Sequence, residues 1–201
     1  MNAPPIIHAR GLGRHYGAKR ALAGVDLDIG RGELLLVTGP NGSGKTTLLR
    51  LLAGLIVPTA GELEVGADRA RIGFLGHDPL VYRELTPLEN LDLYGRLYRI
   101  PERRERIGML LERFGLWDAR SERTDALSRG MVQRLALCRA LLHEPELLLF
   151  DEPFSALDAS GVDLLLDELS SRSSEHTIVV SSHQPERLGD RPTSRLSLAP
   201  A

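Results

Sequence analysis

GPNGSGKT, at residues 39–46, is the stretch that decides the fold, because it matches the phosphate-binding pattern G-x-x-x-x-G-K-[ST] at every position. The runs ELLLVT before it and TLLRLLAG after it predict the strand and the helix that such a loop connects. Its glycines let backbone N–H groups turn inward around phosphate oxygens, and the following helix adds a dipole favourable for anions. We therefore expect a phosphate site, with Lys45 reaching the β and γ phosphates and the Thr46 hydroxyl binding Mg²⁺. Its residues are Gly39, Pro40, Asn41, Gly42, Ser43, Gly44, Lys45, Thr46 and Thr47.

A second motif, LLLFDE at 147–152, places two carboxylates at the end of an apolar strand. Ligands of α/β proteins bind at this end of the strands. Asp151 is therefore expected to bind Mg²⁺, directly or through water, and Glu152 to polarise a water molecule for attack on the γ phosphate. Adjacent carboxylates could instead form a solvated turn, but the phosphate-binding loop favours nucleotide hydrolysis.

The motifs described so far could belong to a kinase, a GTPase or a motor, and the segment that narrows the choice of protein class is LSRGMVQR, at 127–134. Ser128 and Gly130 open a predicted helix and provide a second anion-binding helix N-terminus. Two phosphate sites far apart in one sequence suggest two-fold pairing, in which the serine helix of each chain covers the phosphate loop of the other.

These motifs resemble those of the ATP-binding cassette (ABC) ATPases, whose signature LSGGQ is similar to LSRGM here. Arg129 and Met131 are departures, and Met131 puts one polar contact across the dimer in doubt. The resemblance implies an α/β P-loop NTPase fold with a RecA-like core, a small antiparallel β subdomain and an α-helical subdomain at about 78–140. Residues 1–201 would form a single ATP-binding domain.

The same resemblance implies further site residues. Tyr16, in RHYGAKRAL, resembles the aromatic that stacks on adenine, although a lone tyrosine there could be structural. Asp158 lies in SALD, which resembles the loop that links the two active sites of a dimer. His183, in VVSSHQP, resembles the histidine that contacts the γ phosphate, although it could also cap a turn. His77 stands where the family carries a glutamine in the loop that couples to the membrane partner, so it is either a modified sensor or a non-coordinating loop residue.

The resemblance also implies partners and a location. ATP would drive formation of a homodimer, and integral-membrane transporter subunits would dock on the loop at 77–85 and on Tyr82, Tyr94 and Tyr98, unless these tyrosines are core or surface residues. The chain would lie on the cytoplasmic side of the inner membrane as a peripheral subunit. The segment FLGHDPLVYRELTPLENLDLYGRLY, with DEPFSALD and SSHQP, is similar to the ATPase of the heme exporter of bacterial cytochrome c maturation. Asp78 departs from the expected glutamine. A generic two-component drug or lipid exporter is the alternative, and ATPases of DNA repair or translation are disfavoured.

Composition sets the remaining bounds. A net charge of −2 and 42% hydrophobic residues are typical of a soluble globular protein and give no electrostatic case for nucleic acid. The one cysteine, Cys138, excludes an internal disulfide and is expected to be a buried structural thiol. No run approaches 18 apolar residues, so no membrane span is predicted. Expected strands cover 6–10, 21–29, 33–38, 62–65, 71–75, 146–150, 177–181 and 194–198, and expected helices cover 44–54, 159–171 and parts of 87–143.

Overall fold

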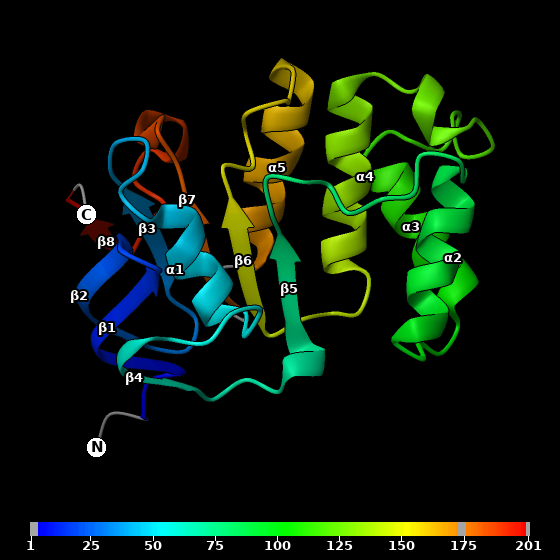
Figure 1. The fold of residues 1–201 in the computed structure, drawn as a ribbon. Coiled ribbons are helices and arrows are strands. Elements are labelled where there is room, and N and C mark those ends of the chain that lie inside the picture. The colour runs from blue at the N-terminus through cyan, green and yellow to red at the C-terminus, as the bar shows by residue number, and fades with distance from the viewer. Residues whose placement is uncertain (1–3, 173–175, 200–201) are drawn as a thin grey trace.

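A five-stranded parallel sheet forms the centre of the computed structural model, which describes residues 4–172 and 176–199 (Figure 1). Its strand order is β5-β6-β7-β3-β8. Every residue of β6 and β7 is buried, which explains why both strands read as continuous apolar runs. The strands are β3 (Leu34–Thr38), β5 (Ile72–Leu75), β6 (Leu147–Asp151), β7 (Thr177–Ser181) and β8 (Ser194–Ser197).

A separate three-stranded antiparallel sheet, in the order β2-β1-β4, lies beside this core (Figure 1). It consists of β1 (Ile7–Tyr16), β2 (Lys19–Ile29) and β4 (Ala60–Val65). Both β1 and β2 extend further toward their shared turn than the sequence predicted. The pairing of β1 and β2 shifts register between Ala9 and Tyr16, and Gly11 has a φ of 58°, so bulges interrupt the alternation that would have marked a longer strand.

Helices cover the parallel sheet and fill the chain between β5 and β6 (Figure 1). Helix α1 (Lys45–Leu52) follows the phosphate-binding loop, and α5 (Ala159–Arg172) follows β6. Between β5 and β6 come α2 (Pro87–Leu97), α3 (Arg103–Arg113) and α4 (Arg129–Leu141). Short 3-10 turns lie at Arg69–Arg71, Thr124–Ala126 and Pro185–Leu188. The parallel core, the antiparallel sheet and the helical region together confirm the predicted fold class.

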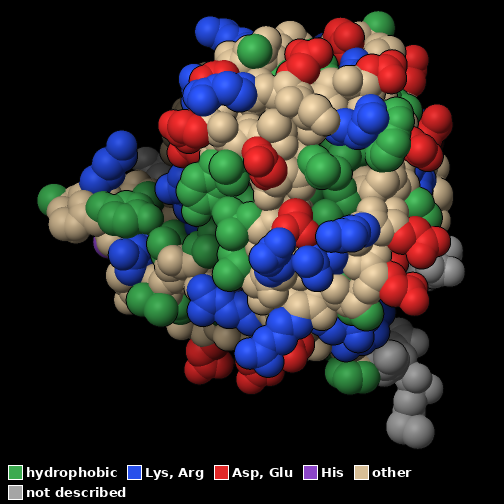
Figure 2. Space-filling model, turned by 90° about the vertical axis from the view of Figure 1, so that its right-hand side faces the viewer, with side chains coloured by type: hydrophobic (Ala, Val, Ile, Leu, Met, Phe, Trp, Pro, Cys, Tyr) green, Lys and Arg blue, Asp and Glu red, His purple; other side chains and the backbone are tan. Residues whose placement is uncertain are grey.

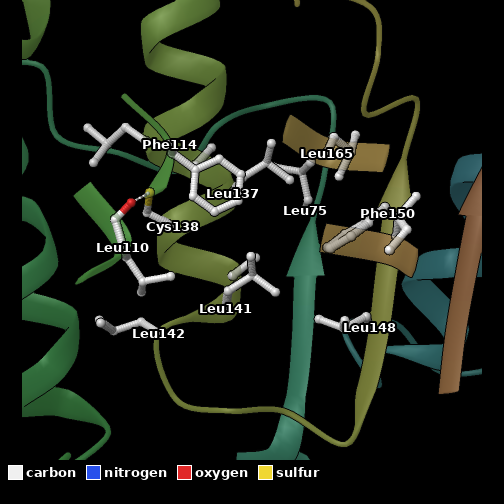
Figure 3. Close-up of a cluster of buried hydrophobic side chains, with 14 of the residues drawn as sticks. Leu75, Leu110, Phe114, Leu137, Cys138, Leu141, Leu142, Leu148, Phe150 and Leu165 are labelled. Carbon is white, nitrogen blue, oxygen red and sulfur yellow. Dashed lines mark hydrogen bonds between the residues drawn. The ribbon is translucent and has the colours of Figure 1, made fainter. Parts of the chain in front are cut away.

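The helical region is fixed to the sheet by one hydrophobic core (Figure 3). Leu137 and Leu141 of α4 pack in the same buried cluster as Leu75 of β5, Phe150 of β6 and Phe114. All five side chains are at most 1% exposed. Because large apolar groups from both regions are buried together, α4 cannot shift relative to β5 and β6 without disturbing this packing.

Cys138 lies in the same cluster, and its thiol contacts the Leu110 carbonyl oxygen at 3.5 Å (Figure 3). Burial raises the pKa of this thiol far above its usual range. The side chain therefore remains a protonated, unreactive group, as expected for a structural cysteine.

The loop between β5 and α2 is held by the first turn of α2. Thr86 caps the helix and forms a capping box with Glu89, in which the side chain of each accepts from the backbone N–H of the other. Buried Asn90 accepts from the Tyr82 N–H at 2.7 Å and donates to the Tyr82 carbonyl at 2.9 Å. These bonds fix the end of the loop that carries His77.

His143, just after α4, predicts a pH dependence of stability. Its ring stacks on Tyr98 at 4.1 Å and contacts the Ile72 carbonyl through Nε2, while burial lowers the pKa of His143. A lowered folded-state pKa gives stability that is complete above about pH 6.5 and is lost as the pH falls toward the folded pKa. The urea midpoint of the wild type should therefore fall more between pH 7.5 and 5.5 than that of His143→Phe, which keeps a ring but cannot titrate. Equal falls in both proteins would contradict this assignment.

Candidate functional site

The phosphate-binding loop between β3 and α1 needs its glycines for steric reasons. Gly39, Gly42 and Gly44 have φ values of 146°, 83° and 97°, a region that side chains disfavour. A Cβ on Gly39 would lie 2.6 Å from the Leu198 carbonyl oxygen, and one on Gly44 would lie 2.4 Å from that of Ala21. The backbone can therefore take this path only with glycine at both positions.

Lys45, the first residue of α1, is held inside this loop. Its ammonium group donates to the carbonyl oxygens of Gly39 at 2.8 Å and Pro40 at 3.3 Å. The Glu152 Oε1 atom lies 3.7 Å away, and only 7% of Lys45 is exposed. The charge is thus oriented before any ligand arrives, and phosphate oxygens could replace the carbonyls around it.

Asp151 ends β6 and lies within the protein with one oxygen satisfied. Oδ1 accepts from the Ser181 hydroxyl at 2.6 Å, whereas Oδ2 is buried without a hydrogen-bond partner. The residue is 2% exposed. A buried carboxylate oxygen without a partner is unfavourable unless a cation or a water molecule completes its contacts.

Glu152 leaves the strand through a strained turn. Its φ is 50°, and its N–H donates to both the hydroxyl and the carbonyl oxygen of Ser181 on β7. This turn brings the Glu152 carboxylate to His183, whose backbone N–H donates to Oε2 at 3.1 Å and whose Nδ1 lies 2.6 Å from it. A left-handed conformation outside glycine costs free energy, so the contacts to Ser181 and His183 must maintain it.

Lys45, Glu152, His183 and part of the phosphate-binding loop line a pocket of about 420 Å³. The chain has two lysines, Lys19 and Lys45, and both line this pocket. His77, exposed in the loop after β5, lines it too, so the structure brings this residue to the same space as the phosphate loop. The full lining is Lys19, Ala21, Asn41, Gly42, Gly44, Lys45, Thr46, Thr47, His77, Glu152, Ser155 and His183.

The residues present fit a magnesium ion, because Asp151 has an unpartnered oxygen and its strand β6 packs against α1, the helix that carries Thr46. Among the described residues, no three His, Cys, Asp or Glu side chains form a metal-binding group. Magnesium typically takes only one or two protein ligands and obtains the rest from phosphates and water. Asp151 and Thr46 are sufficient for that mode of binding, whereas a closed zinc site would need more.

Apart from Asp151 and parts of the phosphate loop, four predicted residues lie outside the lining of this pocket. Ser128 caps α4 by accepting from the Met131 N–H at 3.3 Å. Asp158 accepts from Arg134 of α4 at 2.5 Å, and this hydrogen bond lowers the pKa of Asp158. Tyr16, at the end of β1, is 46% exposed. The fourth is Gly130, in the first turn of α4.

Sequence patterns gave no individual role in this pocket to three residues that complete the site, although Ser155 begins the SALD stretch. Lys19 and Ser155 line the pocket, and Ser181 orients both Asp151 and the Glu152 N–H. The only signal for Ser181 was a polar residue at the end of an apolar strand, and its role depends on β7 lying next to β6. Lys19 lies at the start of a strand that was expected to begin two residues later.

Comparison with known proteins decides the family. A family model described as "ABC transporter" matches residues 22–155. The chain belongs to this family. ABC ATPases with curated names are similar to it over most of its length. The daunorubicin resistance ATP-binding protein DrrA3 of Streptomyces coeruleorubidus is 39% identical over 99% of this chain and 66% of its own length. The cytochrome c biogenesis ATP-binding export protein CcmA of Pseudomonas syringae pv. tomato is 39% identical over 89% of this chain and 87% of its own length.

Solved structures agree with this assignment. A dimeric ATP-binding cassette in a post-hydrolysis state, bound to ADP and Pi, has a TM-score of 0.84 and 28% identity over 96% of this chain and 94% of its own. This ABC-family chain spans just under two thirds of the length of DrrA3. Within the described residues, none of the helices is both long enough and apolar enough to cross a bilayer.

Proposed function

We propose that this ABC-family chain binds and hydrolyses ATP and thereby drives transport by separate membrane subunits. The observation that carries the proposal is the Glu152 carboxylate, which a strained turn holds between Lys45 and His183 at the wall of the pocket. A base, a phosphate-binding cation and a histidine meet in one space, as hydrolysis of a triphosphate requires. Purified protein should release phosphate from ATP only when Mg²⁺ is present, and the absence of any Mg²⁺-dependent hydrolysis would contradict the proposal.

In the proposed mechanism, loop N–H groups and Lys45 bind the phosphates, and Tyr16 stacks on adenine. Asp151 and Thr46 would hold Mg²⁺, which would neutralise charge on the phosphate oxygens. Glu152 accepts a proton from the attacking water, while His183 orients that carboxylate and contacts the γ phosphate. Lys45 leaves the Gly39 and Pro40 carbonyls to reach the β and γ phosphates.

The dimer proposal is supported by the distribution of the phosphate-binding groups. Ser128 and Gly130 do not line the pocket of their own chain, so they are free to cover the pocket of a second copy. Asp158, in the loop after β6, accepts a hydrogen bond from Arg134 of α4, the helix that Ser128 caps and that carries Gly130 in its first turn. This bond joins α4 to the loop after β6. We infer that this loop transmits the closure of one site to the other. Arg129 and Met131 remain departures from the family signature at this interface.

The membrane subunits are proposed to dock on the helical region. Figure 2 views the side of the molecule that carries α2 and α3, where hydrophobic side chains lie beside a group of arginines. A pocket of about 490 Å³ there includes Leu88, Leu93 and Ile107. Such an apolar surface with a charged rim is typical of protein interfaces. The subunit would then be peripheral, on the cytoplasmic side of the inner membrane.

The three tyrosines considered for docking differ in their contacts. Tyr82 is 52% exposed and remains a candidate. The Tyr94 hydroxyl donates to the Leu80 carbonyl at 2.6 Å, and Tyr98 stacks on His143. These contacts support structural roles for Tyr94 and Tyr98, the alternative that sequence patterns left open.

For the transported molecule, we propose heme export in cytochrome c maturation, with drug or lipid export as the second candidate. The sequence identities to CcmA and DrrA3 are both 39%, so identity does not discriminate between these two candidates. The proposal is therefore based on the Gly-His pair at 76–77 and the SSHQP segment. A strain that lacks the gene should lose covalent heme attachment to c-type cytochromes. Normal c-type cytochromes together with new drug sensitivity would instead favour the second candidate.

His77 gives a prediction about coupling. Because Lys45, Asp151 and Glu152 still supply charge and base, His77→Ala should keep the ATPase rate of the isolated chain within roughly tenfold. In the assembled complex, the same change should abolish stimulation by the membrane subunits. His77→Gln should restore most of it, because an amide can both donate and accept hydrogen bonds. ATPase rates with and without membrane subunits test this, and normal stimulation of the alanine variant would make His77 a bystander.

A further inference from the structure

Arg14 covers part of the tyrosine ring that is proposed to stack on adenine. It lies two residues before Tyr16 on β1, and its guanidinium carbon is 4.7 Å from the ring centroid. This distance is within the range of a cation–π interaction. Since 46% of Tyr16 is exposed, the contact leaves ring surface open to a ligand.

The guanidinium group is held in place by the backbone of another segment. It donates from Nη1 to the Val57 carbonyl at 2.9 Å, in the stretch between α1 and β4, and its Nε is buried without a hydrogen-bond partner. Arg10 on the same strand behaves differently, because it is exposed and pairs with Asp28 at 2.5 Å. Both side chains donate to a carbonyl oxygen, that of Val57 for Arg14 and that of Ala9 for Arg10, but the second contact of Arg14 is an aromatic ring whereas that of Arg10 is a carboxylate.

The ring lies at the edge of the nucleotide pocket. Tyr16 pairs with Lys19 across the turn between β1 and β2, and Lys19 lines the pocket. A ring at this place can meet the base of a nucleotide whose phosphates occupy the loop at 39–46. If the Tyr16 side chain rotated freely in the unbound protein, base binding would have to restrict that rotation at a cost in entropy.

We propose that Arg14 is a positioning residue for nucleotide binding, which holds the Tyr16 ring in the orientation that receives adenine. Guanidinium, phenol and base then form three stacked layers. The inference rests on the proposed stacking of adenine on Tyr16, and it adds a residue that acts through that ring without touching the phosphates. Arg14 should therefore affect the binding only of ligands that contain a base, whereas a general role in folding would affect the binding of every ligand.

The test compares a ligand that has a base with one that has none. Calorimetric titration with Mg-ATP and with Mg-tripolyphosphate is done on wild type, Arg14→Met, Arg14→Lys and, as a matched control, Arg20→Met on the neighbouring strand. Arg14→Met should raise the Kd for ATP about two- to fivefold, the scale of one exposed cation–π contact, and leave the Kd for tripolyphosphate unchanged. Arg14→Lys should recover most of the ATP affinity, and Arg20→Met should match the wild type.

A double-mutant cycle identifies the route of the effect. In the Tyr16→Ala background, Arg14→Met should weaken ATP binding no further, because the ring through which it acts is gone. Equal weakening of ATP and tripolyphosphate, persistence of the effect without the ring, or an unchanged ATP affinity would each overturn the inference. Failure of the underlying proposal looks different: the single variant Tyr16→Ala would then bind ATP as the wild type does.

Discussion

The Glu152→Gln variant is expected to hydrolyse ATP at least about a hundredfold more slowly than the wild type while still binding it, the usual scale for losing a general base. Glutamine has nearly the same shape and keeps an oxygen that can accept from the His183 N–H, which Glu152 accepts at 3.1 Å. It cannot take a proton from water. ATP binding should persist because Lys45 and the phosphate loop are unchanged.

Slow hydrolysis should also trap the dimer. If each ATP is covered by Ser128 of a second chain, the variant should elute earlier than the wild type in size-exclusion chromatography with Mg-ATP, and at the same volume without nucleotide. Steady-state phosphate release and equilibrium ATP titration complete the measurement. Glu102→Gln is a matched control, because Glu102 also has a left-handed backbone, with a φ of 49°, and does not line the nucleotide pocket. Normal turnover by the Glu152→Gln protein would move the catalytic role to another residue.

The parts of the site that sequence could predict depend on short local patterns. The glycines of residues 39–46 permit the positive φ values that the loop has, and Asp151 follows an apolar run that is long enough only for a strand. Both patterns carry their own geometric meaning, so the phosphate loop, the strand end and the α/β class followed from them. The comparisons confirm the family and the fold class.

The remaining contacts depend on which strands lie side by side. Ser181 can orient Asp151 only because β7 pairs with β6 in the register that places these two residues opposite each other. Arg14 can meet the Tyr16 ring only because bulged β1 extends to residue 16 and Val57 lies beside it. Neither contact can be predicted from a local sequence pattern, because Val57 is 43 residues from Arg14 and Asp151 is 30 residues from Ser181.

The helical region shows a second limit. Tyr94 and Tyr98 are four residues apart at the end of α2, a spacing that fits both a core face and a docking face. Their contacts to Leu80 and His143 come from segments distant in sequence, so only the fold distinguishes the two roles. The same limit applies to Ser128. Its position at the start of α4 followed from the sequence, whereas the proposed contact with the phosphate loop of a second chain is tested by the dimer experiment.

Lys45→Ala is expected to abolish measurable ATP binding, with a loss of at least about a hundredfold in affinity, because charged hydrogen bonds to phosphate contribute about 1.5–3 kcal/mol each. In the free protein the ammonium group is held by the Gly39 and Pro40 carbonyls, so it needs little rearrangement to reach the phosphates. Alanine removes the charge but leaves the loop backbone and its glycines intact. Equilibrium titration with Mg-ATP measures the loss, and the affinity for tripolyphosphate should fall by the same factor. In Arg14→Met, by contrast, the affinity for tripolyphosphate is expected to stay unchanged.

The two lysines provide an internal control for this prediction. Lys19 lines the same pocket from the start of β2, so Lys19→Ala removes an equal charge from the pocket without touching the phosphate loop. Its effect should be several-fold at most, since long-range attraction in a solvated pocket is weak beside direct hydrogen bonds. The same pair permits a direct test in the wild type. Amine-reactive labelling followed by mass spectrometry should show Lys45 protected by Mg-ATP to a far greater degree than Lys19. Equal protection, or an alanine variant at position 45 that binds ATP normally, would show that the phosphates lie elsewhere in the pocket.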